Sequence, residues 1–312
     1  MNQKMRITKS ELNKSMTRRE RVLEAIRHHE TDIVPYQVDL TSAAYAQLMD
    51  LVQDPEYLKR MGNHIVQGTY DMFVGETVLG SGFWRDDFGV VWNRTSIDTD
   101  IGFVEGIVLH EPSLSGFHAE LNETRLRQGL EQALAAVEDE CRVVDVGWGL
   151  FERGWTLRGM ENLLVDMIAE PKFVDQLFER LCDHQMRVID IALEYPFDLV
   201  LFGDDWGGQT GLILGKKHWQ RYLKPHFARM FEKVKNAGKF IALHSCGNIK
   251  ALFPDLIDIG LDVYQTFQPE IYDIQAVKRE YGKALAFEEE SVRNVFSPLE
   301  LRRTSSGLHG RR

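Results

Sequence analysis

Cysteine is scarce in this chain, which has three cysteines, Cys141, Cys182 and Cys246, among 312 residues. So small and odd a number cannot build a disulfide framework and is typical of a reducing compartment. No apolar run approaches the ~20 residues that a membrane-spanning helix needs. Residues 1–21 are polar and basic and lack the apolar core of a secretory signal. We therefore expect a cytoplasmic protein without a membrane anchor.

Basic patches are lacking as well. Lys and Arg number 37 against 47 Asp and Glu, which gives a net charge of −10 at pH 7. No basic stretch with interleaved aromatic residues compensates, so the sequence argues against a nucleic-acid partner. A Gly-x-Gly-x-x-Gly turn after an early strand is also missing, which weakens a dinucleotide-binding interpretation.

What the sequence does contain is an alternation of apolar runs and segments with helical periodicity. Strands are predicted at residues 32–39, 70–79, 143–150, 197–205, 240–244, 263–268 and 284–287. Helices are predicted at residues 17–29, 55–68, 122–138, 171–195, 217–237, 249–259 and 274–281. Thr17 and Glu20 have the spacing of a capping box at the start of the first helix. Such alternation implies parallel strands joined by helical crossovers.

Two architectures fit this alternation, an open doubly wound sheet and a (β/α)8 barrel of the TIM type. We favour the barrel, because several strands carry polar residues at their carboxyl ends, where such barrels place their active sites. Residues 84–112 are turn-rich and β-like and form an excursion from the barrel. The expected organisation is a flexible segment at residues 1–16, a barrel domain at 17–287 and an aberrant tail at 288–312.

The strand at residues 240–244 runs into His244-Ser245-Cys246-Gly247-Asn248. Residues i and i+2 of a strand point the same way, so His244 and Cys246 project together. Imidazole and thiolate are preferred zinc ligands, and catalytic zinc keeps one position open for substrate. The alternative is a buried thiol beside a core histidine.

Other polar residues at strand ends are candidates for the site. Asp204 and Asp205 end one strand and face opposite sides, so one of them enters the cleft and the other caps a turn. Gln209 lies in the following loop and is a candidate hydrogen-bonding partner of the substrate. Asp39 ends the first predicted strand, with capping of the next helix as the alternative. Glu76, in the second strand region, is a candidate carboxylate ligand.

Three motifs in order resemble the uroporphyrinogen decarboxylase superfamily. They are the opening at residues 17–35, Gly203-Asp204-Asp205-Trp206-Gly207-Gly208-Gln209, and His244-Ser245-Cys246-Gly247-Asn248. The resemblance implies a distorted (β/α)8 barrel with a funnel-shaped cleft. It also implies one of two chemistries. One is cofactor-free decarboxylation of the acetate arms of uroporphyrinogen. The other is methyl transfer between a corrinoid protein and a small-molecule thiol, with zinc held by His-x-Cys and a later Cys.

The residues favour the methyltransferase branch. True decarboxylases carry an early Arg-Gln-Ala-Gly-Arg-Tyr motif whose arginines pair with substrate carboxylates, whereas residues 35–46 contain no arginine. His244 and Cys246 match the zinc-binding branch. No cysteine follows Cys246, so we expect a carboxylate from Asp204, Asp205 or Glu76 to complete the ligand set. The alternatives are a tetrapyrrole decarboxylase and an inactive, truncated barrel.

The tail at residues 288–312 supplies neither an eighth strand nor its helix. Codons permitted for residues 288–307, read one base earlier, can spell a stretch that resembles the superfamily. We therefore expect the tail to be a frameshift product and the barrel to be incomplete at its C-terminus. Unpaired edge strands would then favour poor solubility or a homodimer.

Overall fold

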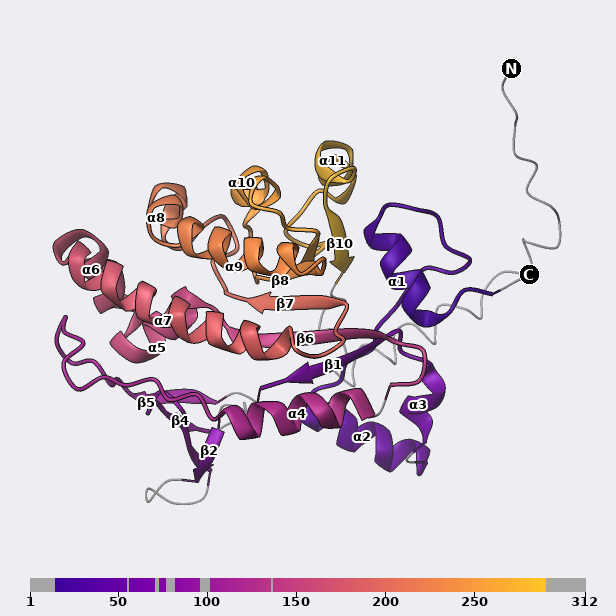
Figure 1. The fold of residues 1–312 in the computed structure, drawn as a ribbon, viewed down its shortest axis with the longest axis horizontal. Helices are drawn as coiled ribbons and strands as arrows, with labels where there is room; N and C mark the ends of the chain where they lie inside the picture. The colour runs from indigo at the N-terminus through magenta and orange to yellow at the C-terminus, as the bar shows by residue number, and fades with distance from the viewer. Residues whose placement is uncertain are drawn as a thin grey trace, which may run out of the picture.

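The fold is seen in a computed structural model that describes residues 15–54, 56–70, 73–76, 82–95, 102–135 and 137–289. Six parallel strands form the main sheet in the order β1-β6-β7-β8-β9-β10, so each later strand adds to the same edge (Figure 1). These strands are β1 (Ile65–Thr69), β6 (Cys141–Trp148), β7 (Leu199–Gly203), β8 (Phe240–His244), β9 (Val263–Phe267) and β10 (Ala286–Glu289).

Helices precede, connect and flank the strands of the main sheet. They are α1 (Arg18–Ile26), α2 (Ser42–Val52), α3 (Tyr57–Met61), α4 (Glu123–Ala135), α5 (Leu150–Arg158), α6 (Met160–Ala169), α7 (Pro171–Ala192), α8 (Gly215–Tyr222), α9 (Lys224–Asn236), the 3₁₀ helix η2 (Lys250–Leu252), α10 (Phe253–Asp258) and α11 (Ile274–Tyr281). In the described ranges, no helix combines the length and the apolar character needed to cross a membrane.

A second, antiparallel sheet with the order β2-β3-β4-β5 overlaps the β-rich excursion predicted at residues 84–112. Its strands are β2 (Phe73–Glu76), β3 (Phe83–Asp86), β4 (Val91–Asn93) and β5 (Phe103–Gly106). Asp86 anchors this sheet to the barrel domain through a buried ion pair with Arg153 of α5, at 2.6 Å.

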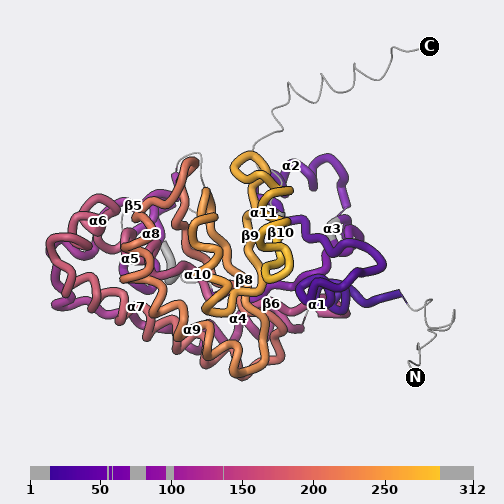
Figure 2. The backbone as a smooth tube through the Cα atoms, turned by 90° about the horizontal axis from the view of Figure 1, so that it is seen from above, coloured from indigo at the N-terminus to yellow at the C-terminus, as the bar shows by residue number. Residues whose placement is uncertain are grey.

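The inner face of the main sheet is apolar at its amino end. The capping box of Thr17 and Glu20 is present and starts α1. This helix lays Val22, Leu23 and Ile26 against inward side chains from β6 to β9, and Ala286 of β10 packs on the same cluster. The first helix and the last strand therefore lie side by side, as Figures 1 and 2 show. Within the described residues, β1 and β10 are not paired with each other.

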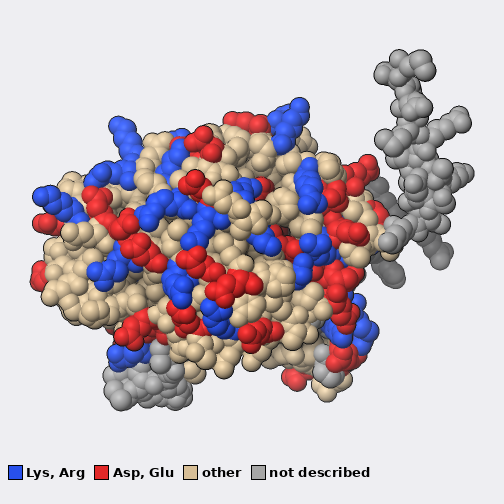
Figure 3. Space-filling model, in the orientation of Figure 1, with Lys and Arg blue, Asp and Glu red and all other residues tan. Residues whose placement is uncertain are grey.

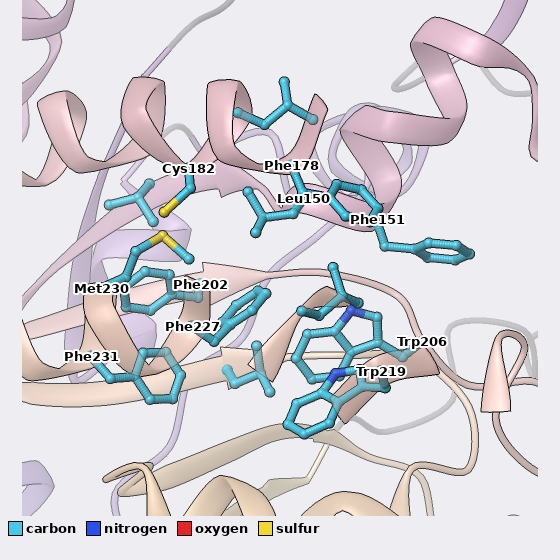
Figure 4. Packing of buried hydrophobic residues seen from close by; sticks show 14 of the residues in the cluster. Leu150, Phe151, Phe178, Cys182, Phe202, Trp206, Trp219, Phe227, Met230 and Phe231 are labelled. Atoms are coloured by element: carbon cyan, nitrogen blue, oxygen red, sulfur yellow. The ribbon is translucent and has the colours of Figure 1, made fainter. Parts of the chain in front are cut away.

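The outer face carries the larger core. Phe202 of β7 packs on Phe227 and Phe231 of α9, while Trp206 lies edge-on to Trp219 of α8 (Figure 4). On the face of the molecule seen in Figure 3, Lys and Arg are interspersed with Asp and Glu, so neither sign of charge dominates this surface.

Two predictions of elements near the N-terminus were wrong, and one helix was missed. Residues 32–39 form no strand: Val38 bonds the side chain of Asn63, and the backbone bond from His64 to Tyr36 is not continued into a ladder. The helix predicted at 55–68 ends at Gly62, whose φ of +70° closes α3, and Ile65 then begins β1. Helix α2 at Ser42–Val52, capped by Thr41, was not predicted.

Candidate functional site

The carboxyl ends of β7 and β8 lie next to each other because these parallel strands are hydrogen-bonded neighbours. β7 ends just before Asp204 and Asp205, and β8 ends at His244, two residues before Cys246. The structure places Sγ of Cys246 3.6 Å from Nε2 of His244. The histidine and the cysteine thus lie together at the edge of the sheet where TIM-type barrels carry their active sites.

Asp205 joins this pair from the neighbouring strand. Its Oδ1 accepts the backbone N–H of Cys246 at 2.7 Å and lies 3.9 Å from Nε2 of His244. One ligand atom from each of Asp205, His244 and Cys246 lies within 4.8 Å of the other two, and all three residues are partly exposed. In the described part of the chain, no other His, Cys, Asp or Glu side chains form such a group.

Asp204 points away from this group and is fully buried. Its carboxylate accepts the backbone N–H groups of Phe151 and Glu152, at 3.0 and 2.8 Å, and the indole N–H of Trp206 at 2.7 Å. Helix α5 has Gly149 at its N-cap and no side-chain cap of its own, so Asp204 caps it from the loop after β7. Burial raises the pKa of Asp204 to about 7, although these hydrogen bonds act in the opposite direction.

Two glycines hold the loops after β7 and β8 against each other. A Cβ on Gly207 would lie 2.6 Å from the carbonyl oxygen of Cys246 and 2.7 Å from the nitrogen of Asn248. Gly247 has a φ of +76°, and its own Cβ would collide with the backbone of Gly207. The N–H of Asn248 donates to the carbonyl of Gly208 at 2.8 Å. Cys246 is therefore positioned by close backbone contact between two loops.

Polar side chains on the inner face lie next to the Asp205, His244 and Cys246 group. Oε1 of Gln265, on β9, lies 3.2 Å from Nδ1 of His244. Asp145, on β6, accepts a hydrogen bond from Gln67 at 3.2 Å. Burial raises the pKa of Asp145, while the bond from Gly147 and the nearby His244 lower it.

Sequence reasoning missed Asp145, Gln265 and Glu152. Asp145 and Gln265 are each a polar residue within a largely apolar strand. A polar residue at an inward position of such a strand indicates a site residue, so this pattern could have identified both. Glu152 lies in the first turn of α5, and burial followed by the charges of Asp205 and Asp204 raises its pKa well above the ordinary value. No local pattern marks Glu152, because only the tertiary fold brings α5 to the end of β7.

The remaining predicted site residues are Asp39, Gln209 and Glu76. Asp39 is exposed, accepts a hydrogen bond from Gln37 and neither ends a strand nor caps α2. Gln209 is exposed in the loop after β7. Glu76 belongs to β2 in the second sheet, and its side chain is outside the described residues. Its predicted role as a ligand stays a prediction.

The separation of Cys246 and His244 fits two ligands of a tetrahedral zinc ion. Bonds of about 2.3 Å to sulfur and about 2.05 Å to nitrogen would separate the two atoms by about 3.6 Å, which is the observed distance between Cys246 and His244. The remaining cysteines are unsuited to binding a metal. Both are buried, and burial raises the pKa of Cys141 to about 12 and that of Cys182 to about 11.

Comparison with known sequences gives a partial match. Residues 152–287 match the family model described as uroporphyrinogen decarboxylase (URO-D). A uroporphyrinogen decarboxylase of Thermus thermophilus is 29% identical over 97 residues, which are 31% of this chain and 27% of that protein. The match thus spans about a quarter of that relative's length.

Comparison with solved structures covers far more of the chain. A methyltransferase from Methanosarcina mazei superposes with a TM-score of 0.67, over 91% of this chain and 86% of that one, at 17% sequence identity. This likeness confirms the predicted class of fold, an α/β barrel of parallel strands. The family match over residues 152–287 and the shared fold together confirm that the chain resembles the uroporphyrinogen decarboxylase superfamily.

Proposed function

We propose that Asp205, His244 and Cys246 bind a zinc ion and that the protein transfers a methyl group to a small-molecule thiol. The observation that carries the proposal is the convergence of three ligand atoms within 4.8 Å at the carboxyl ends of β7 and β8. The methyltransferase fold of the structural neighbour supports it. Asp205 takes the place of the second cysteine that the superfamily's zinc-binding branch uses.

Zinc, when bound, lowers the pKa of a thiol and presents its sulfur as a nucleophile. Three protein ligands leave a fourth tetrahedral position for that sulfur. Asp205 holds the loop of Cys246 through its bond to the Cys246 N–H. The thiol loses its proton on binding, and the carboxylate of Asp145 is a nearby acceptor whose raised pKa favours taking that proton. The sulfur then bonds the methyl carbon while the bond between that carbon and the donor breaks, and the donor keeps the electron pair.

The methyl donor in this proposal is a small corrinoid protein that docks over the barrel mouth. A tetrapyrrole decarboxylase is the competing function, supported by the family match. Its substrate carries several carboxylates, which arginines usually pair. The end of the barrel that carries Asp205 instead gathers Asp145, Glu152 and Asp204, acidic groups that supply no positive charge to pair with such a substrate.

The first test measures metal. Protein purified without chelator should contain zinc that a chelator removes, because a site with three protein ligands, one of them a carboxylate, holds it less firmly than a four-ligand structural site. Cys246→Ser should abolish binding, since a hydroxyl is a far poorer ligand than a thiolate. Cys182→Ser is the matched control and should bind as the parent does. Absence of zinc, together with failure to retain added zinc, would refute the proposal.

The second test measures reaction. With methylcobalamin as the probe donor and a panel of small thiols, the zinc-loaded protein should form the methyl thioether, and Cys246→Ser should not. Formation of coproporphyrinogen from uroporphyrinogen at ordinary enzyme concentrations would instead assign the chain to the decarboxylases.

A further inference from the structure

The end of β9 contains a β-bulge beside His244. Glu288 of β10 pairs with Gln265, but the next residue, Glu289, pairs with Phe267. Thr266 is therefore an extra residue with no counterpart on β10. Bulges bend a strand and redirect its side chains, and they are frequent next to active sites.

Thr266 also has an unfavourable backbone conformation. Its φ is +63°, although it is β-branched, and its side chain is buried. Only three described residues other than glycine have positive φ, and Thr266 is the one that is both buried and β-branched. A β-branched residue in the left-handed region is strained and persists only where the surroundings impose it.

The bulge brings two successive side chains to one atom. Residues i and i+1 of a regular strand point to opposite faces. Here Oε1 of Gln265 lies 3.2 Å from Nδ1 of His244, and Oγ1 of Thr266 lies 3.4 Å from the same nitrogen. The redirected backbone at Thr266 makes this convergence feasible.

The hydrogen-bond roles of both partners follow from a count of donors. The Thr266 hydroxyl donates its hydrogen to the carbonyl of Gln265 at 2.7 Å, so towards His244 it can only accept. Oε1 of Gln265 is an acceptor as well. Nδ1 of His244 must then carry the hydrogen, which leaves the lone pair of Nε2 facing Cys246 and Asp205.

We infer that Gln265 and Thr266 are positioning residues that fix the Nδ1–H tautomer of His244 and thereby aim its Nε2 at the metal position. The inference rests on the proposed function for the identity of what Nε2 binds, but the tautomer itself is a property of the metal-free protein. A metal-binding histidine commonly donates its other N–H to such a partner, and loss of that partner weakens metal binding 10- to 100-fold as a rule.

The test reads the tautomer directly by ¹⁵N NMR of histidine-labelled, metal-free protein at a pH where His244 is neutral. The parent should show Nδ1–H at His244. Gln265→Leu and Thr266→Val should each shift the population towards Nε2–H, and Gln265→Glu, which keeps an acceptor, should restore the parent signal. Gln275→Leu, an exposed glutamine on α11, is the matched control and should change nothing.

Zinc affinity, measured by competition with a chelator, is the second readout. Gln265→Leu should lose about 10- to 100-fold in affinity, and Gln265→Glu should recover most of it. Thr266→Gly relieves the positive φ, so the thermal midpoint should stay or rise while zinc affinity falls. A residue with only a structural role would not separate these two quantities.

The outcomes distinguish this inference from the proposed function. The inference is overturned if His244 of the parent protein carries its hydrogen on Nε2. It is also overturned if the hydrogen stays on Nδ1 in both Gln265→Leu and Thr266→Val. Should Gln265→Leu fail to fold, the parent spectrum and Gln265→Met still decide. The expected tautomer pattern in a protein that binds no zinc would support the positioning role and refute only the metal proposal.

Discussion

The contact between Gly207 and the loop of Cys246 allows a prediction for which the neighbouring glycine, Gly208, is the matched control. Gly207→Ala would put a methyl group 2.6–2.7 Å from three backbone atoms of residues 246–248. Neither Gly207 nor its neighbour Gly208 has a positive φ, so alanine fits both backbones and only space differs. For Gly208→Ala, the nearest atom would be 3.5 Å away, an ordinary van der Waals contact.

The magnitude follows from this crowding. Backbone atoms cannot rotate away as a flexible side chain can, so the loops must separate, and overpacking of this kind costs about 1–3 kcal/mol. At about 2–4 °C per kcal/mol, Gly207→Ala should lower the thermal midpoint by roughly 2–12 °C. Gly208→Ala should be neutral or slightly stabilising, because alanine reduces the entropy of the unfolded chain by about 0.4–1 kcal/mol.

The assay is thermal unfolding of both variants, followed by zinc affinity under the same buffer conditions. Gly207→Ala should also bind zinc more weakly, because the displaced loop carries Cys246 away from His244 and Asp205. Equal thermal midpoints for the two variants would refute the reasoning. So would a large loss of stability in Gly207→Ala with unchanged zinc affinity, since the loop contact would then not position the cysteine.

Three further predictions concern buried polar groups. Asp204→Asn should lose about 1–3 kcal/mol of unfolding free energy, because an amide cannot accept all three N–H donors, whereas Asp205→Asn should weaken zinc binding with little loss of stability. Urea unfolding and zinc competition on the same samples separate the two aspartates. Asp86→Asn should cost about 3–5 kcal/mol by breaking the buried ion pair with Arg153, while Glu194→Gln, at the exposed pair with Arg127, should cost far less because solvent screens that pair; equal losses would contradict this. Burial lowers the pKa of His184 to about 4, so the folded state binds its proton less readily than the unfolded state, and stability should fall as pH drops from about 6.5 to about 4. That loss amounts to about 3 kcal/mol for this group, and urea titrations should show it diminished in His184→Phe.

Much of the scaffold could be predicted from local patterns. The second half alternates apolar runs and amphipathic segments over residues 197–287, and β7 to β10 and α8 to α11 lie there. The N-terminal half was harder. Residues 32–39 have the composition of a strand, but Val38 bonds the side chain of Asn63, and a single backbone bond from His64 to Tyr36 makes no ladder. A ladder needs two chains in register, which a single apolar run does not specify.

The pairing of His244 and Cys246 was readable from sequence, since strand alternation puts residues i and i+2 on one face whatever the rest of the chain does. The sequence did not show which of the two aspartates lies beside them. Asp204 and Asp205 are adjacent and chemically identical, and only the packing of α5 against β7 commits the first to a helix cap and leaves the second beside the cysteine.

The sequence alone thus determined the alternating elements and the two residues on one strand, because those depend on periods of two and 3.6 along the chain. The tertiary structure decided everything that depends on contacts between distant segments. Asp205 reaches Cys246 across strands, Gln265 and Thr266 reach His244 through a bulge, and Gly207 contacts the loop of Cys246 because the two loops leave neighbouring strands. Residues 21 to 41 positions apart meet there because parallel strands bring their carboxyl ends to one edge of the sheet.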